Sequence, residues 1–166
     1  LDIVPTAEMW ATMDARRAMT TYHWMFLSQP APLPERLIGA DPIFFLDWTL
    51  ASWTRARTLS AFPDASLAAY RSALSRPERI HAFCEDYRAG ASLDRAHDEA
   101  DRAAGRLIAA PLLALWGDAG IPGEGRSPLD VWREWADDVR GHAIACGHFL
   151  PEEAPRETLA ALLDFF

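Results

Sequence analysis

The spacing of apolar residues changes along the chain and divides it into segments of different expected structure. Residues 1–4 predict the end of a strand, which Pro5 stops. From Thr6 to Leu27 the apolar residues recur at helical spacing, which predicts one continuous helix. A proline-rich break covers residues 28–35, and helical patterns follow at residues 35–46, 47–56, 64–74, 77–90 and 92–106.

The second half of the chain has a different pattern of apolar residues. Residues 107–117 are an apolar run typical of a strand buried on both faces of a parallel sheet. A loop, a short helix, a short strand leading to a loop, and a closing helix are then predicted over residues 118–128, 129–138, 139–149 and 151–166. The closing helix carries Glu152 and Glu153 in its first turn, where the helix dipole favours acidic side chains. This order predicts an α/β core that carries one long helical insertion.

Length and charge limit the function classes. With 166 residues, half of them apolar, the chain is long enough for one domain with a hydrophobic core. A formal net charge of −8 argues against nucleic acid and anionic membrane surfaces as partners. No apolar run approaches the roughly 20 residues of a membrane span. Cys84 and Cys146 have no metal-binding or redox spacing, which favours a reducing cytoplasm.

Two ionisable residues stand at the ends of predicted strands. In open α/β sheets, ligands bind beyond the carboxyl ends of the strands, so His148, before the closing helix, is a candidate general base. Asp2, at the end of the first strand, could hold an imidazole tautomer through the ring Nδ1–H. Position alone fits two other roles as well: a loop histidine that caps a helix, and a turn or N-cap aspartate.

Four residues of the helical region offer ring N–H groups, a hydroxyl or apolar surface. His23 and Trp24 are adjacent donors in an apolar stretch, and adjacent positions on a helix do not share a face. Tyr87 adds a hydroxyl and Trp53 a large apolar ring, although each of the four also fits packing in a helical core. His97 stands among acidic residues at metal-like spacing, but a solvated helix face explains that pattern better, and we predict no metal site.

The sequence contains no recognisable nucleophile. It has no P-loop, no dinucleotide-binding fingerprint and no serine nucleophile elbow. It opens at Leu1 on the apolar stretch "LDIVP", as if cut within a buried strand. We therefore expect a fragment of a longer protein, in which a nucleophile would lie one strand before Leu1.

Seven segments together resemble the fluoroacetate (haloacetate) dehalogenases of the α/β-hydrolase superfamily. They span nearly the whole chain in the family's order and spacing: LDIVPT, YHWMFLSQPAPLPE, ASWT, CEDYRAGASLDRAHDEAD, PLLALWG, PLDVWREWA and GHFLPEEAP. LLALWG and GHFLPEE are typical of the superfamily, whereas YHW and EDYRA point to the haloacid group. The resemblance implies the C-terminal part of an α/β-hydrolase fold, with parallel-sheet core strands and a mostly helical cap insertion.

The resemblance also implies roles for the candidate residues. Asp2 would be the acid and His148 the base of a catalytic triad. His23, Trp24 and Tyr87 would donate hydrogen bonds to a departing halide, and Trp53 would line the substrate pocket. The family's nucleophile is an aspartate upstream of Leu1, followed by arginines that bind the substrate carboxylate, so the fragment alone is expected to be inactive.

The implied function is hydrolytic dehalogenation of a haloacetate, fluoroacetate or chloroacetate, to glycolate and halide through an aspartyl ester. It needs no metal or organic cofactor, and its partner is a small-molecule haloacid; a homodimer is an expectation from the family alone. Residues 1–9 would be a core strand end with the triad acid, residues 10–92 the cap, and residues 93–166 the rest of the core. The alternatives are a related epoxide hydrolase or esterase-like hydrolase, and a non-catalytic binding protein on the same fold.

Overall fold

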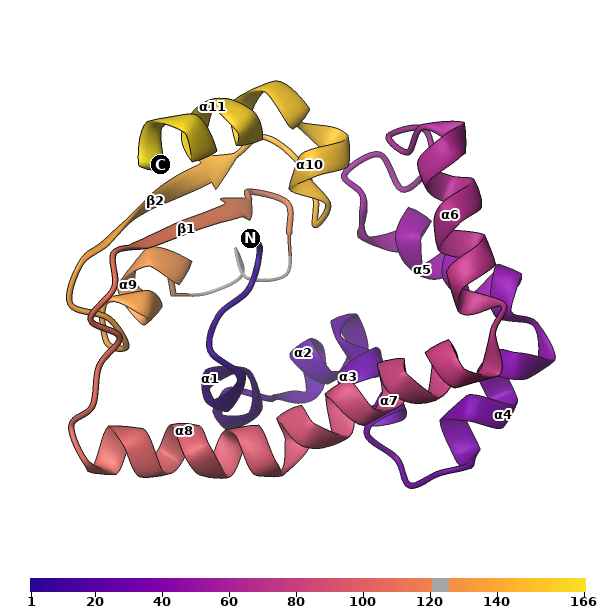
Figure 1. The fold of residues 1–166 in the computed structure, drawn as a ribbon, viewed down its shortest axis with the longest axis horizontal. Helices are drawn as coiled ribbons and strands as arrows, with labels where there is room; N and C mark the ends of the chain where they lie inside the picture. Colours follow the sequence, from indigo (N-terminus) through magenta and orange to yellow (C-terminus); the bar gives the residue numbers. More distant parts are fainter. Residues whose placement is uncertain (121–125) are drawn as a thin grey trace. The chain divides into compact units, whose positions relative to one another are not determined.

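The structure, a computed structural model, describes residues 1–120 and 126–166. Part of the predicted loop at 118–128, residues 121–125, therefore lies outside the described residues. The elements of Figure 1 follow one another along the chain as α1 (Thr6–Ala11), α2 (Ala15–Thr20), α3 (Tyr22–Leu27), α4 (Leu33–Ala40), α5 (Pro42–Trp53), α6 (Asp64–Leu74), α7 (Pro77–Ala91), α8 (Leu93–Ala103), β1 (Leu112–Gly117), α9 (Pro128–Trp132), β2 (Val139–Ile144), α10 (Leu150–Glu153) and α11 (Pro155–Phe165).

These elements form two compact units. Unit 1 consists of Leu1–Pro5, Leu50–Phe62 and Asp101–Phe166, and unit 2 of Thr6–Thr49 and Pro63–Ala100. The predicted division placed all of residues 10–92 in one helical segment. In the structure, the stretch that contains Trp53 groups instead with the strands of unit 1.

Unit 1 is built on two parallel strands. β1 pairs with β2 over its whole length, from Leu112 opposite Val139 to Gly117 opposite Ile144. Parallel neighbours need a crossover connection, and α9 lies within it. The buried core between strands and helices consists of Leu115, Ile144, Cys146, Leu150 and Ala154, and Ala161 of α11 packs against it. In Figure 1, α11 runs alongside β2.

Unit 2 is helical and is organised around α7. The α7 helix packs against α3 and α4, and its buried Ile80 and Cys84 meet Leu27 and Ile38 in one core cluster. Aromatic side chains surround this cluster, among them Tyr87. Full burial of each aliphatic side chain stabilises the packing by about 1.5–3 kcal/mol. The predicted helices at 64–74 and 77–90 are confirmed as α6 and α7.

The predicted continuous helix from Thr6 to Leu27 is wrong, because the structure has three short helices there. Asp14 ends the first break as an N-cap: its carboxylate accepts the backbone N–H of Arg17 at 2.7 Å. Thr21 marks the second break, with its buried hydroxyl bonded to the carbonyl of Arg17 at 2.7 Å. Both side chains compete locally with helical backbone bonding, which apolar periodicity does not register.

Other boundaries also moved. The predicted strand at residues 1–4 is not formed, although the Asp2 N–H donates to the Leu115 carbonyl at 2.7 Å. Regular pairing in β1 begins only at Leu112, after Pro111, which has no N–H to donate. The predicted helix at 129–138 ends at Trp132, and the closing helix divides before Pro155 into α10 and α11. Proline favours a first helical position, so a new helix begins there.

None of the helices within residues 1–120 and 126–166 combines the length and the apolar character needed to cross a membrane.

Candidate functional site

Asp2 adopts an unusual backbone conformation that directs a buried carboxylate at the end of β1. Its φ is +52°, in the left-handed region that aspartate tolerates better than most residues, and only 2% of the residue is exposed. The Gly117 N–H donates to Asp2 Oδ1 at 2.7 Å. The carboxylate is therefore held by the backbone at the end of β1, whereas the sequence predicted that Asp2 ends a strand of its own.

Gly120 leaves the space that this carboxylate occupies. A Cβ added at Gly120 would lie 2.6 Å from Asp2 Oδ1 and 2.7 Å from Oδ2, closer than real contacts allow. Any larger residue would displace the carboxylate. The contributions of Gly117 and Gly120 to this site were not predicted from the sequence. The signal available for Gly117 was its place at the end of the apolar run LLALWG.

His148 completes a pair with Asp2. Its Nδ1 lies 2.6 Å from Asp2 Oδ2, and because an ionised carboxylate can only accept, Nδ1 carries the proton. The imidazole is 27% exposed, which leaves Nε2 as the nitrogen available for proton transfer. Asp2 and His148 are 146 positions apart, and the structure brings them together as the sequence analysis predicted.

Trp53 lies against the same imidazole. The two ring centroids are 5.3 Å apart in an edge-to-face arrangement, and the backbone N–H of His148 donates to the backbone carbonyl of Trp53 at 2.9 Å. Three of the predicted site residues, Asp2, Trp53 and His148, therefore meet within unit 1.

The remaining three predicted residues meet within unit 2. Ring centroids of His23 and Tyr87 are 5.5 Å apart, those of Trp24 and Tyr87 5.8 Å, and those of His23 and Trp24 6.4 Å. All three pairs are edge-to-face, and His23 is only 4% exposed. α3 presents the adjacent rings of His23 and Trp24 to one side chain of α7, so the two rings meet at Tyr87 although they do not share a helix face.

Burial fixes the protonation state of Tyr87. Removal of the phenol from water, reinforced by the negative charge of Asp86, raises the pKa of Tyr87 to about 12. The hydroxyl is therefore neutral at physiological and moderately alkaline pH and can donate a hydrogen bond. Burial likewise raises the pKa of Cys84 and of Cys146 to about 11, so neither thiol is an activated nucleophile.

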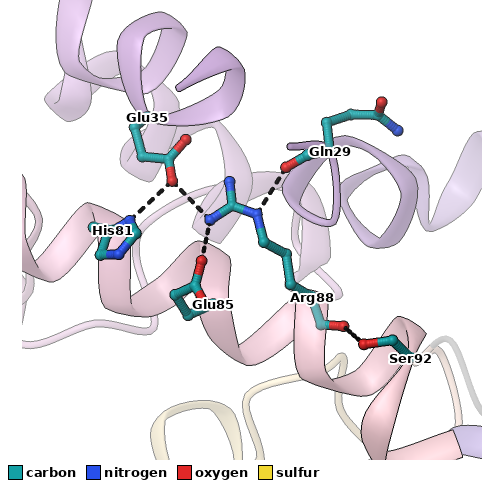
Figure 2. Close-up of polar contacts among 6 residues, drawn as sticks. All are labelled: Gln29, Glu35, His81, Glu85, Arg88 and Ser92. Carbon is teal, nitrogen blue, oxygen red and sulfur yellow. Dashed lines mark hydrogen bonds and ion pairs between the residues drawn. The ribbon is translucent and has the colours of Figure 1, made fainter. Parts of the chain in front are cut away.

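A second polar cluster in unit 2, shown in Figure 2, surrounds Arg88. Its guanidinium donates to Glu35 at 2.8 Å, to Glu85 at 2.5 Å and to the Gln29 carbonyl at 2.8 Å, so it ties α7 to α4 and to the end of α3. Hydrogen bonds from Arg88 and His81 hold the pKa of Glu35 at about 2.

Potential metal ligands also gather in this cluster. Within the described ranges, one oxygen or nitrogen each from Glu35, His81 and Glu85 lies within 4.8 Å of the other two. The Arg88 guanidinium contacts both carboxylates and neutralises the charge that a cation would need. The cluster is therefore an ion-pair network, and His97, the candidate weighed from the sequence, is an exposed residue of α8 outside it.

Comparison with characterised proteins agrees with the residue patterns. The chain is 36% identical over 165 residues to a fluoroacetate dehalogenase from Burkholderia sp., covering 99% of the chain and 53% of that protein. It is 30% identical over 131 residues to a soluble epoxide hydrolase from Corynebacterium sp. (strain C12), covering 78% of the chain and 43% of that protein. The chain thus spans about half the length of the curated relatives it matches.

Structural comparison gives the same fold. The structure matches that of a protein from Nostoc sp. PCC 7120, described as an α/β hydrolase, with a TM-score of 0.93 and 49% identity. The match covers 99% of this chain and 55% of that one. No family model matches the chain.

Proposed function

Because the chain belongs to the α/β-hydrolase superfamily, of which it has part of the fold, we propose that it functions within a haloacetate dehalogenase. In this proposal a longer protein contains the chain, and a segment before it supplies a nucleophilic aspartate. Fluoroacetate or chloroacetate would be hydrolysed to glycolate and halide. The support for a longer protein is that the chain matches only about half of its relatives.

The reaction has two steps. A carboxylate oxygen of the nucleophile attacks the halogen-bearing carbon, the new C–O bond forms an ester, and the halide leaves with the electron pair of the C–X bond. In the second step His148 Nε2 takes a proton from water, and the water oxygen attacks the ester carbonyl. The glycolate oxygen then leaves with a proton, and the aspartate is regenerated. Asp2 stabilises the imidazolium that forms between these proton transfers.

The observation that carries the choice of substrate is the ring cluster of His23, Trp24 and Tyr87. The leaving halide gains negative charge as the C–X bond breaks, most of all when it is fluoride. Neutral N–H and O–H donors held in place before the reaction stabilise that charge in the transition state. Burial raises the pKa of Tyr87 from 10 to about 12, so its hydroxyl stays protonated and able to donate in alkaline solution as well. In the proposal these three residues bind the halide and Trp53 lines the substrate pocket.

An epoxide hydrolase is the second candidate. The relative from Corynebacterium favours it, and so does the same hydroxyl, because a neutral Tyr87 can donate to an opening epoxide oxygen. Both reactions use an aspartyl ester and the pair formed by Asp2 and His148. They differ in the atom that leaves the carbon, which is a halide in one reaction and the epoxide oxygen in the other.

The two buried thiols of Cys84 and Cys146, which form no disulfide, favour a cytoplasmic location.

Halide release by the longer protein tests the proposal. Fluoroacetate and chloroacetate are supplied to the parent and to His23→Ala, Tyr87→Phe and Tyr70→Phe, and free fluoride and chloride are measured. We expect His23→Ala and Tyr87→Phe to lower fluoride release on the order of 10²-fold, and chloride release less, because fluoride depends more on hydrogen bonding. Tyr70, on α6, is the matched control and should behave as the parent.

One outcome would overturn the proposed reaction, and another would overturn the role of the ring cluster in it. A parent with its aspartate intact that opens a terminal epoxide but releases no halide from any haloacetate is an epoxide hydrolase. Equal losses of fluoride and chloride release in Tyr87→Phe would reduce the ring cluster to a packing role.

A further inference from the structure

The carboxylate of Glu153 collects backbone N–H groups from both sides of His148. Gly147 N–H donates to Glu153 Oε2 at 3.1 Å, and Phe149 N–H donates to Oε1 at 3.1 Å. A third donor comes from a distant segment, because Arg55 N–H reaches Oε2 at 2.8 Å. One side chain at the end of α10 therefore satisfies three peptide groups, two of which flank the candidate base.

This arrangement matters because His148 lies in irregular backbone. Residues 145–149 belong to neither β2 nor α10, so their N–H groups lack the regular partners of a strand or helix. The His148 N–H itself donates to Trp53, two residues before Arg55. Glu153 thus closes a loop of contacts in which the segment at residues 53–55 and the segment at residues 147–149 hold each other.

The segments approach so closely that position 147 must be glycine. A Cβ there would lie 2.5 Å from Arg55 N, 2.6 Å from the Trp53 carbonyl oxygen and 2.8 Å from Glu153 Oε1. Such packing leaves little freedom for the peptide planes around His148 once the carboxylate is in place. The backbone of residues 147–149 therefore fixes where the imidazole begins, and the hydrogen bond to Asp2 fixes its ring.

We propose that Glu153 is a positioning residue for His148: it fixes the peptide groups on both sides of the base and locks them to the backbone of Trp53 and Arg55. The inference rests on the proposed function, in which His148 acts in ester hydrolysis and not in ester formation. Glu153 should therefore affect the second step of the reaction selectively. Glu153 lies in the first turn of a helix, as predicted, but that helix is the four-residue α10, which Glu153 also ends, and its carboxylate binds loop N–H groups.

Glu153→Gln is the informative variant. The substitution keeps the shape but replaces one acceptor oxygen by an NH₂ group, which cannot accept from a peptide N–H. At least one of the three donors then loses its partner, and the loop shifts. A displacement of about 1 Å at a catalytic group lowers rates by up to about 10²-fold. Glu157→Gln, the same change at an exposed position of α11, is the matched control.

The experiment follows both steps in the longer protein. With haloacetate, we expect Glu153→Gln to release one equivalent of halide per enzyme as rapidly as the parent and then to turn over about 10-fold more slowly or worse. Intact-mass spectrometry should show the ester accumulating, and KM should not rise. Glu157→Gln should match the parent. Unchanged turnover in Glu153→Gln, or equal losses in the burst and in turnover, would overturn the positioning role.

A second measurement separates this inference from the proposed function. In protein labelled with ¹⁵N-histidine, the His148 Nδ1–H resonance, assigned by its loss in His148→Gln, reports the bond to Asp2 without any substrate. We expect Glu153→Gln to shift or broaden this resonance and Glu157→Gln to leave it in place. If the parent releases no halide, the proposed function fails while this resonance still decides the role of Glu153. An unchanged resonance in folded Glu153→Gln contradicts that role.

Discussion

Unit 1 and unit 2 both take carboxylates out of water, but they satisfy them with different partners. In unit 1, Asp2 and Glu153 accept hydrogen bonds from backbone N–H groups. In unit 2, Glu35 pairs with the side chains of Arg88 and His81. Arg88 and Glu35 side chains are only 16% and 15% exposed, so this pair is largely shielded from solvent.

The difference has an electrostatic consequence. A peptide N–H stabilises a carboxylate without adding an opposite net charge, so the negative charge of Asp2 remains available to the imidazole of His148. An arginine cancels the charge of its partner and leaves little field for a substrate or a proton. Backbone-bound carboxylates therefore suit the reacting site of unit 1, whereas the ion pair of unit 2 suits the joining of helices.

The largest effect is expected where the charge of Asp2 is removed. In Asp2→Asn the amide oxygen can accept from the Gly117 N–H, which turns the NH₂ group toward His148 Nδ1. Nδ1 must then accept a hydrogen bond, so the proton moves to Nε2 and the imidazole can no longer act as a base there. Turnover of haloacetate by the longer protein should fall on the order of 10⁴-fold while the single-turnover halide burst remains. Steady-state and rapid-quench halide assays measure the two quantities.

Asp118→Asn provides the matched control for that variant. Asp118 also lies in unit 1, but it forms an exposed ion pair with Arg55, and exposed pairs contribute little. We expect its turnover to stay within a few-fold of the parent. Similar losses in both variants would mean that charge in unit 1 matters only through folding, and the contrast between the units would disappear.

The local sequence predicted the elements better than their boundaries. Strands β1 and β2 and helices α6 and α7 follow from the apolar runs and the apolar periodicity of the sequence. The breaks at Asp14 and Thr21 arise from side chains that bond to nearby backbone, which leaves the apolar pattern unchanged. The positive φ of Asp2 has no signature in the sequence at all, because it depends on the approach of β1.

The site was predictable to a similar degree. Asp2 and His148 were found because residues at the carboxyl ends of parallel strands gather at one edge of a sheet. The strand expected at residues 1–4 is not formed, and Asp2 reaches that edge by hydrogen bonds to β1. His23, Trp24 and Tyr87 needed the family resemblance, since adjacent rings on a short helix fit a core equally well. Glu153 was missed in its role because one of its three donors, Arg55, lies in a distant segment, and no spacing near Glu153 encodes that contact.

In unit 2, removal of the arginine should cost stability rather than chemistry. Arg88→Met keeps the apolar stem but leaves Glu35 without its main partner, and we expect the free energy of unfolding to fall by about 2 kcal/mol. Arg76→Met is the matched control, because the ion pair of Arg76, the N-cap of α7, with Glu78 is exposed to solvent. Denaturant unfolding of the longer protein measures both. A loss in Arg88→Met no larger than in Arg76→Met would show that the buried pair does not hold the helices.

The smallest effect is a dependence of stability on acid. The pKa of Glu35 is lowered from 4.5 to about 2, chiefly by the hydrogen bond from Arg88. A lowered pKa means that the pair stabilises the folded state above pH 4.5, and that this contribution is lost as the pH falls toward 2. After solvent screening the contribution is on the order of 1 kcal/mol.

This contribution of the Glu35 charge is isolated by measuring the free energy of unfolding of the parent and of Glu35→Gln between pH 5.5 and about pH 2.5. The difference between the two proteins should be greatest at the upper end and shrink steadily as acid protonates Glu35. In unit 1 the same scan should give no such difference for Asp118→Asn, whose ion pair is exposed to solvent. A difference between parent and Glu35→Gln that stays constant over the whole range would mean that the carboxylate contributes shape rather than charge. The electrostatic distinction between the two units would then have to rest on Asp2 alone.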